Sequence, residues 1–261
     1  NASPITNLSY THARVGHITQ ATGLFGAGQS DTRGYTYDAL YRLTNVSSTN
    51  APYSAAETFT YDAVGNRSLH TDGSAHAYEY WPSSNRLKAI HAGTITGTIE
   101  KGFTYDDEGR LTSQTGIGAK TLTWDQKGRA KQMIAGTHTN TFRYDPMDYR
   151  IGRTGGRLGN RDYYLEGEHL EAEYTNNQLQ AKYFRGISTD ELVAGFTFTN
   201  GTLTPSLYHH DALTSVTGVT AHDGQSQQGL VYGAFGNQKT LTGSTQNRLR
   251  YTGREIDLDT Q

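Results

Sequence analysis

A short phrase that recurs along the chain constrains the fold more than any other feature of the sequence. In its clearest copies it reads aromatic-Thr-Tyr-Asp, then a few residues, a Gly and an Arg or Asn, as in residues 103–110. A period near twenty residues is typical of arrays in which each unit buries its apolar face on its neighbours. The chain is therefore predicted to be a tandem array. Its aromatic anchors, 19 to 25 residues apart, are Tyr37, Tyr61, Tyr80, Tyr105, Trp124, Tyr144, Tyr164, Tyr183, Tyr208, Tyr232 and Tyr251.

Each copy has the chemistry of a β-hairpin. Phe103 and Tyr105 are two residues apart, so they point to one face of a strand, and Thr104 points to the other. Asp106 suits the first position of a type I turn, where its carboxylate accepts backbone N–H bonds. Gly109 supplies the positive φ that closes a short hairpin with a bulge. About twenty residues accommodate two such strands and two turns, so one hairpin per repeat is expected.

Composition agrees with an all-β chain. Among 261 residues there are 30 Gly and 18 Tyr but only 5 Pro, as expected for many short strands joined by Gly-closed turns. The repeat runs through the whole length, and no Pro-rich or Ser-rich linker divides it. One continuous sheet is therefore predicted instead of two globular domains.

The charge pattern argues against several partners. The net charge is −2, with Lys and Arg dispersed among Asp and Glu, so no basic stripe is present to hold nucleic acid. No apolar run approaches the roughly twenty residues that a membrane-spanning helix needs. The first residues lack a signal sequence, so the chain is expected to be cytoplasmic or exported by a route that it does not encode. With no cysteine, disulfides and thiolate metal sites are excluded.

The Tyr-Asp-x-x-Gly-Arg/Asn motif, as in 61–67 and 105–111, resembles the YD repeats of the Rhs family. This family includes the C components of insecticidal toxin complexes and the teneurins. The segments 208–220, 232–236 and 251–255 resemble the last repeats of bacterial Rhs cores, except that Thr214-Ser215 stands where Gly-Ser is common. The resemblance divides the chain into a YD-repeat array at 1–204 and terminal Rhs-core-like repeats at 205–261, continuous with the same sheet.

The resemblance implies a sheet that spirals into a hollow β-shell and encloses a polypeptide cargo, usually a toxic C-terminal domain, in a secreted or cell-surface protein. Family members commonly continue into a segment whose aspartates cut the chain, and this sequence stops before it, so no autoproteolytic residue is assigned. Open sheet edges invite pairing with further strands. The chain is thus expected to be part of a larger protein, with the enclosed polypeptide or neighbouring YD repeats as partners, or to self-associate.

The repeated aspartates could be mistaken for the paired carboxylates of a polysaccharide-degrading enzyme. Their recurrence at the same turn position favours a capping role instead. We therefore predict a structural repeat motif with no catalytic residue, no cofactor and no metal. Its members are Tyr37, Asp38, Tyr61, Asp62, Gly65, Tyr105, Asp106, Gly109, Trp124, Asp125, Gly128, Tyr144 and Asp145.

Two other patterns have a structural and a functional interpretation. His209 and His210, next to Asp211, are metal-ligand types, but neighbouring residues of a strand face opposite sides and do not easily share one ion. The Gly-rich stretches 23–28 and 152–159 superficially resemble phosphate-binding loops, yet no helix start follows them. They are interpreted as connections between hairpins.

The aromatic ladder keeps a functional alternative open. Tyrosines repeated on one face could bind sugar rings or an extended polypeptide, with Tyr78 and Tyr80 as candidate binding residues. The same rings could instead pair across strands and stabilise the sheet. Three functions remain: a shell segment, which is favoured, a carbohydrate- or protein-binding module, and an enzyme built on the repeat sheet.

Overall fold

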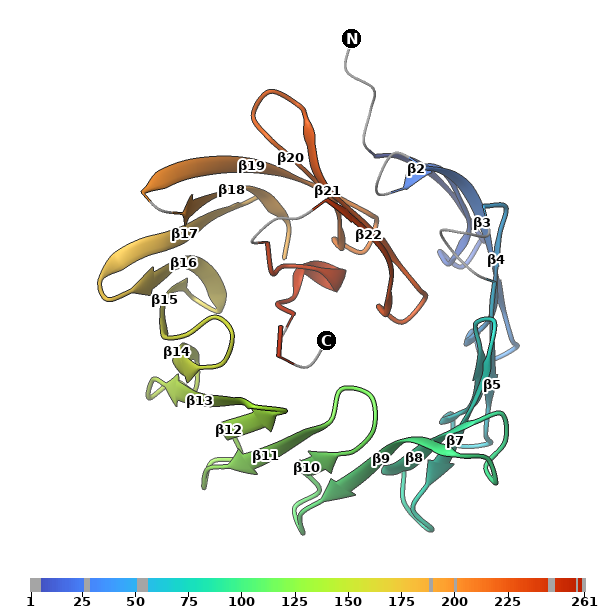
Figure 1. The fold of residues 1–261 in the computed structure, drawn as a ribbon. Coiled ribbons are helices and arrows are strands. Elements are labelled where there is room, and N and C mark those ends of the chain that lie inside the picture. Colours follow the sequence, from blue (N-terminus) through green and yellow to red (C-terminus); the bar gives the residue numbers. More distant parts are fainter. Residues whose placement is uncertain are drawn as a thin grey trace. The chain divides into compact units, whose positions relative to one another are not determined.

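The computed structural model of the chain describes residues 6–25, 29–50, 56–187, 190–199, 201–243, 247–256 and 258–259. They form 22 strands of one antiparallel sheet, in which strands close in sequence are neighbours (Figure 1). This confirms the all-β, tandem-hairpin prediction.

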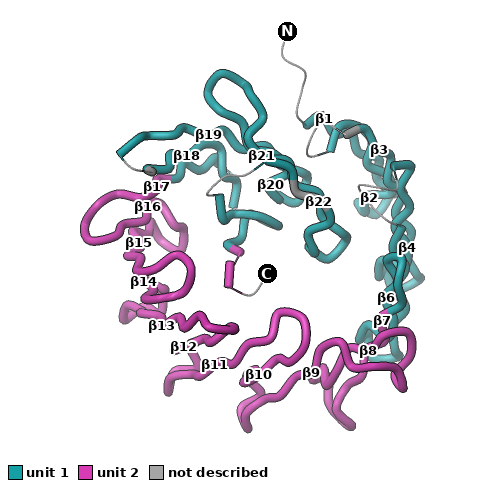
Figure 2. Tube along the Cα trace, viewed as in Figure 1, with its two compact units in different colours: residues 1–75, 183–255 teal, residues 76–182, 256–261 magenta. Residues whose placement is uncertain are grey.

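The chain divides into two compact units, coloured separately in Figure 2. Unit 1 comprises 1–75 and 183–255, and unit 2 comprises 76–182 and 256–261. The predicted boundary at 204/205 lies inside strand β19 (Thr202–His210), and the division at that point stays a prediction.

Unit 1 contains the first and the last strands of the chain. They are β1 (Asn7–His12), β2 (Ile18–Phe25), β3 (Gln29–Tyr37), β4 (Leu43–Ser48), β5 (Glu57–Tyr61), β6 (Arg67–Thr71), β18 (Leu192–Thr199), β19 (Thr202–His210), β20 (Val216–Thr220), β21 (Ser226–Tyr232) and β22 (Gln238–Gly243), with a 3-10 turn, η2 (Tyr251–Gly253). Antiparallel ladders join β1 through β6 and β18 through β22 in order.

Unit 2 contains the middle of the array, and its strands also pair in chain order. They are β7 (Ala75–Tyr80), which begins at the last residue of the first part of unit 1, β8 (Leu87–Ala92), β9 (Ile99–Tyr105), β10 (Leu111–Gln114), β11 (Lys120–Trp124), β12 (Ala130–Ala135), β13 (His138–Tyr144), β14 (Arg150–Gly155), β15 (Arg161–Glu166), β16 (His169–Thr175) and β17 (Gln178–Arg185), which ends in unit 1. The described residues contain no helix long and apolar enough to cross a membrane.

Each motif turn has the same local geometry, because the same residue types recur in it. In the turn between β3 and β4, Tyr41 N–H donates to the Asp38 carbonyl (2.9 Å) and Asp38 N–H to that of Arg42 (3.0 Å). The pairing then shifts by one residue, with Thr36 opposite Asn45 and Tyr37 opposite Leu43. This is a type I turn followed by a bulge. The bulge returns at Tyr61, Trp124, Tyr144 and Tyr232, so the repeat sets the strand register.

Burial alternates along strands such as β5, β11 and β15 but not along β20 and the end of β21. Every residue of β20 is buried, as are Gln228 to Tyr232 of β21. The segment that follows β22 in unit 1 contacts the start of β20: Val216 N–H donates to the Arg250 carbonyl (3.0 Å), and Thr252 N–H to the Ser215 hydroxyl (3.1 Å). In unit 1 the final repeats are thus covered on more than one side, and polar residues such as Thr217, Thr220 and Gln228 are buried with the apolar ones.

Candidate functional site

The repeated aspartates cap their own turns. Asp38 accepts the backbone N–H groups of Leu40 and Arg42 at Oδ1 (both 2.9 Å), and its Oδ2 accepts the Arg42 Nε–H at 2.6 Å. The side chain therefore holds both ends of the turn, as expected for an Asp at its first position. The corresponding carboxylates accept backbone N–H groups in the same way at Asp62, Asp106, Asp125, Asp145 and Asp211.

Except at Asp211, the aromatic residue directly before each of these aspartates reaches back to the previous hairpin. Tyr61 donates its hydroxyl to the Leu43 carbonyl at 2.7 Å, just after the turn of the preceding repeat. Because Leu43 lies at the bulge, this bond satisfies a backbone group next to the irregular pairing. Equivalent bonds join Tyr37 to Ile18, Tyr105 to Leu87, Trp124 to Leu111, Tyr144 to Ala130, Tyr232 to Val216 and Tyr251 to Ala234.

The arginine after the turn reaches forward to the next hairpin. Arg42 donates from Nη1 to the Asp62 carbonyl (3.2 Å), and its guanidinium lies 4.7 Å from the centre of the Tyr61 ring. Arg129 repeats the arrangement with the Asp145 carbonyl (3.4 Å) and the Tyr144 ring (4.8 Å). We call the capping Asp, the backward aromatic bond and the forward Arg contact together the YD brace. Since its aromatic and Arg bonds join successive hairpins, the brace ties neighbouring repeats together wherever these bonds form.

The braces change the acidity of their carboxylates. Hydrogen bonds from Arg42 N–H and Arg129 N–H, with further help from the arginine side chains, lower the pKa of Asp38 and of Asp125 below the usual value. Burial raises the pKa of Tyr61 and Tyr144, so these hydroxyls stay protonated and can donate.

These pKa values predict an acid-sensitive sheet. A carboxylate with a lowered folded pKa stabilises the fold fully above its ordinary pKa of about 3.9, and this contribution is lost as pH falls through the lowered value. The midpoint of urea unfolding should therefore drop as pH is taken below about 4. Asp125→Asn keeps the shape but not the charge, so its midpoint should depend less on pH than that of the parent. If the urea midpoint fell equally with pH in the variant and the parent, the lowered pKa of Asp125 would not contribute to stability.

Where the motif has a glycine at the last turn position, that glycine has a positive φ. The values are 94° at Gly65, 83° at Gly109 and 77° at Gly128. Tyr41 (φ 61°) and Thr214 (φ 60°) take this conformation without being Gly, so Thr214 occupies the place of the missing glycine at the cost of strain.

Gly109→Val is expected to destabilise the chain by about 1–3 kcal/mol, because a β-branched residue is almost excluded from positive φ. A Cβ at Gly109 would also lie 3.1 Å from Nη2 of Arg86. Thr104→Val, on the exposed face of β9, is the matched change and should cost little. Urea unfolding measures both. If neither variant lost stability, the turn assignment would be wrong.

Tyr78 and Tyr80 lie on β7, where both are half-buried. Tyr78 is opposite Ile90 and Tyr80 opposite Leu87 of β8. Their role in binding stays a prediction.

His209 and His210 are consecutive on β19. His209 Nε2 lies 3.0 Å from the Thr220 hydroxyl, and burial lowers the pKa of both imidazoles. Across the described residues, no three His, Cys, Asp or Glu side chains gather as metal ligands would.

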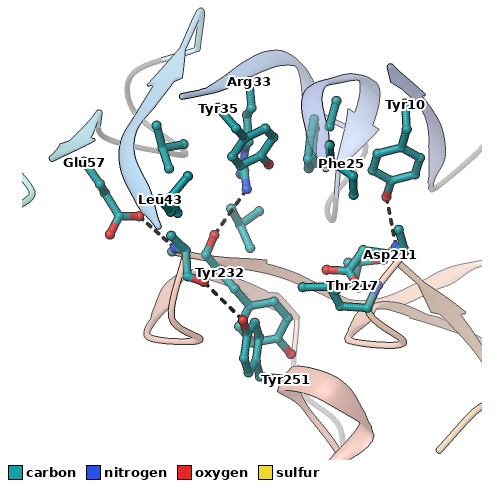
Figure 3. Close-up of a pocket in the computed structure, with 18 of the residues that line it drawn as sticks. Tyr10, Phe25, Arg33, Tyr35, Leu43, Glu57, Asp211, Thr217, Tyr232 and Tyr251 are labelled. Atoms are coloured by element: carbon teal, nitrogen blue, oxygen red, sulfur yellow. Dashed lines mark hydrogen bonds between the residues drawn. The ribbon is translucent and has the colours of Figure 1, made fainter. Parts of the chain in front are cut away.

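A cavity of about 390 Å³ lies within unit 1, and no sequence motif predicted it. One wall comes from strands β1–β5 and the other from the last repeats. Figure 3 shows Arg33 and Tyr35 across from Tyr232 and Tyr251. Aromatic rings supply much of the lining, from Tyr10, Phe25, Tyr35, Tyr37, Tyr232 and Tyr251.

Hydrogen bonds beside this cavity connect the first strands of unit 1 to its last repeats. Arg33 donates from Nη1 to the Tyr232 carbonyl (3.2 Å), and the Tyr10 hydroxyl accepts Ala212 N–H (3.0 Å). The Glu57 carboxylate accepts Ala234 N–H (3.0 Å). These contacts span 177 to 202 residues of sequence. The cavity therefore lies at a junction where the two ends of the array meet.

The carboxylates at the cavity already have structural partners. Glu57 Oε2 lies 2.9 Å from His70 Nε2, and its hydrogen bonds with His70 and Ala234 are among the causes that leave its pKa lowered despite desolvation. Burial raises the pKa of Asp211, whose Oδ1 caps the turn after β19. Both groups hold backbone in place. The arrangement thus favours a structural junction over a pair of catalytic acids.

A second long-range contact lies within unit 2. Asp259 is buried against the β13–β14 hairpin, where Asn140 Nδ2 (2.9 Å) and Arg153 Nη2 (3.0 Å) both donate to its Oδ2. Sequence reasoning missed it because Asp259 follows the last repeat and carries no motif. The available signal was Asn140 and Arg153, polar residues at inward strand positions.

No family model matches the chain. It is 28% identical over 222 residues to the tRNA3(Ser)-specific nuclease WapA of Bacillus spizizenii. The matched region covers 77% of this chain and 8% of that protein. Among solved structures it is similar to the Photorhabdus luminescens Tc holotoxin pore (TM-score 0.65, 11% identity) and to TcdB2-TccC3 (TM-score 0.63, 11% identity).

Each of these two structural matches covers 97% of this chain and 16% of the solved one, so the chain spans a small part of its relatives. At such identity the likeness concerns the fold. Together with the antiparallel sheet and the recurring braces, it confirms the resemblance found in the sequence. The chain has the Rhs/YD-repeat fold.

Proposed function

We propose that this chain is a wall segment of an Rhs/YD-repeat shell that encloses a C-terminal polypeptide, such as a toxin or other effector. The observation that carries the proposal is the YD brace. In a brace the carboxylate holds its own turn, while the aromatic side chain and, where present, the guanidinium bond to the neighbouring hairpins, so the motif residues serve the sheet. A sheet built from such repeats suits a long wall.

The similar structures support this role. Toxin-complex proteins share the fold with this chain over 97% of its length. The curated relative is a nuclease, but the similarity covers 8% of it, and the brace residues already act as structural partners. We therefore assign no enzymatic activity to this segment. Export to the cell surface or the medium belongs to the same proposal.

The test uses the protein as its source cell makes it. Its intact mass and the sequence after residue 261 would first show what polypeptide follows. Limited proteolysis would then compare this polypeptide in the native protein with the same polypeptide expressed alone. We expect protection in the native protein, lost when urea unfolds the sheet. Equal rates of digestion, or a native chain ending at residue 261, would refute the enclosure.

A binding module is the second candidate, and the aromatic-lined cavity of unit 1 is the observation that favours it. Tyr78 and Tyr80 lie in unit 2 and do not line this cavity, so carbohydrate or protein binding through them is a separate form of this alternative. Saturable glycan binding that is lost in the Tyr78→Ala/Tyr80→Ala variant, with unchanged unfolding, would support it. Binding that survives this change would assign the glycan to another surface.

A further inference from the structure

The Gly-rich loop after β14 binds the carboxylate of Asp259. Asp259 Oδ1 accepts the backbone N–H of Arg157 at 3.0 Å, while its Oδ2 accepts the two bonds from Asn140 and Arg153. The Arg157 side chain adds a weaker contact, with Nε 3.8 Å from Oδ1. One carboxylate thus meets a backbone amide, a side-chain amide and a guanidinium. Such convergence of donors is typical of an anion-binding site.

The donors are held in place by contacts that do not involve Asp259. Asn140 is fully buried on β13, and Arg153 is 2% exposed on β14. Arg153 also donates from Nη2 to the Asn140 side-chain oxygen, which orients the amide so that its Nδ2 faces Asp259. The Gly156 N–H bonds to the Thr139 carbonyl (3.0 Å), which positions the loop against β13. The site is therefore built from two adjacent strands and their loop.

Gly156 leaves the space that the carboxylate fills. Its φ is +66°, and a Cβ added there would come within 3.0 Å of Asn140 Oδ1, Arg153 Nη2 and Asp259 Oδ2. Gly159, three residues on, has nearly the same φ of +64° but nothing within 4 Å of an added Cβ. Only the first of these glycines is required by the site itself.

We propose that Asn140, Arg153 and the loop 155–159 form a carboxylate receptor that anchors the segment after the last repeat through Asp259. The receptor belongs to unit 2, and its occupant is a residue of the same chain. It fixes the point of the sheet from which any following polypeptide departs. The inference does not depend on enclosure of a cargo.

The first experiment measures amide exchange by NMR in the full chain with Asp259→Ala. The Arg157 N–H loses its acceptor, so its exchange should accelerate by about tenfold or more. The matched control is Asp162→Ala, because Asp162 is a half-exposed aspartate of β15 in the same unit, paired with Arg143. It should leave Arg157 unchanged. Unaltered exchange in Asp259→Ala would overturn the proposal.

The second experiment compares Gly156→Ala with Gly159→Ala. Both place a Cβ at similar positive φ, so their backbone strain is matched. Only Gly156→Ala crowds the receptor, and only it should accelerate Arg157 exchange. Equal effects of the two variants would mean that strain alone is responsible, and would count against the receptor.

The third experiment restores the missing anion. Sodium acetate added to Asp259→Ala should slow Arg157 exchange again in a saturable manner, and sodium chloride at equal ionic strength should not. In the parent chain the site is already filled, so acetate should have no effect. The same response to both salts, or in both proteins, would show that no carboxylate receptor exists.

Discussion

Gly116→Ala is expected to destabilise the chain by about 3 kcal/mol or more, measured by urea unfolding. Gly116 has a φ of +77°, in the turn between β10 and β11, and a Cβ there would come within 3.0 Å of the Glu100 carbonyl of β9. The obstacle is backbone of the neighbouring strand, which cannot move without disturbing the ladder. The bond from Thr115 N–H to the Gly102 carbonyl (2.9 Å) would be strained with it.

Gly93→Ala separates the two causes of this loss. Gly93 has almost the same φ of +75° and lies in the same unit, but an added Cβ meets nothing within 4 Å. Its cost should be that of positive φ alone, about 1 kcal/mol. If the two variants unfolded at the same urea concentration, the close approach to Glu100 would not be a cause of the loss in stability.

The second large effect is expected at Asp31, which is 3% exposed on β3 of unit 1. Its carboxylate accepts the hydroxyl of Ser48 (2.9 Å) and the backbone N–H groups of Thr49 (3.0 Å) and Asn50 (3.1 Å). It also pairs with Arg33 Nε at 3.1 Å. Asp31→Leu removes these acceptors while the arginine stays buried. Breaking a buried pair in this way costs about 3–5 kcal/mol.

A double variant tests the reason for that loss. In Asp31→Leu/Arg33→Leu the buried charge is removed together with its partner, so the double variant should be more stable than Asp31→Leu alone. Urea midpoints of the parent, both single variants and the double variant complete the cycle. A double variant less stable than either single one would show that the pair does not act as a unit.

Much of the fold could be predicted from the sequence because the repeat acts locally. Asp106 and Arg110 are four residues apart, and their contact at 2.7 Å closes a turn whose first position favours Asp. The position of Gly109 follows from the same turn. Such contacts need no knowledge of the rest of the chain.

The reach of the brace between hairpins was only partly predictable. The sequence placed Tyr105 on one face of its strand, but not its bond to the Leu87 carbonyl, 18 residues earlier. That bond joins β9 to the first residue of the preceding strand, Leu87, which lies beside a register shift in the β7–β8 ladder. The spacing of repeats suggested stacking, and the geometry of the sheet selected the partner atom.

The junction in unit 1 lay beyond sequence reasoning. Arg33 and Glu57 are charged residues in strands, and their residue type alone would place them toward water, although each lies two residues before an aromatic on the same strand face. They are buried because Tyr232 and Ala234, 199 and 177 residues later, supply their partners.

The sequence by itself determined the all-β class, the hairpin repeat and the turns, because a capping carboxylate, a positive-φ glycine and an alternating strand each act within a few residues. Only the tertiary structure decided which buried charges are paired, where the cavity of unit 1 lies, and that the Gly-rich loop at 155–159 receives Asp259. The physical reason is distance along the chain: the contacts that close the cavity of unit 1 and that bind Asp259 join residues 100 or more apart, and no periodic pattern records where a folded sheet brings them together.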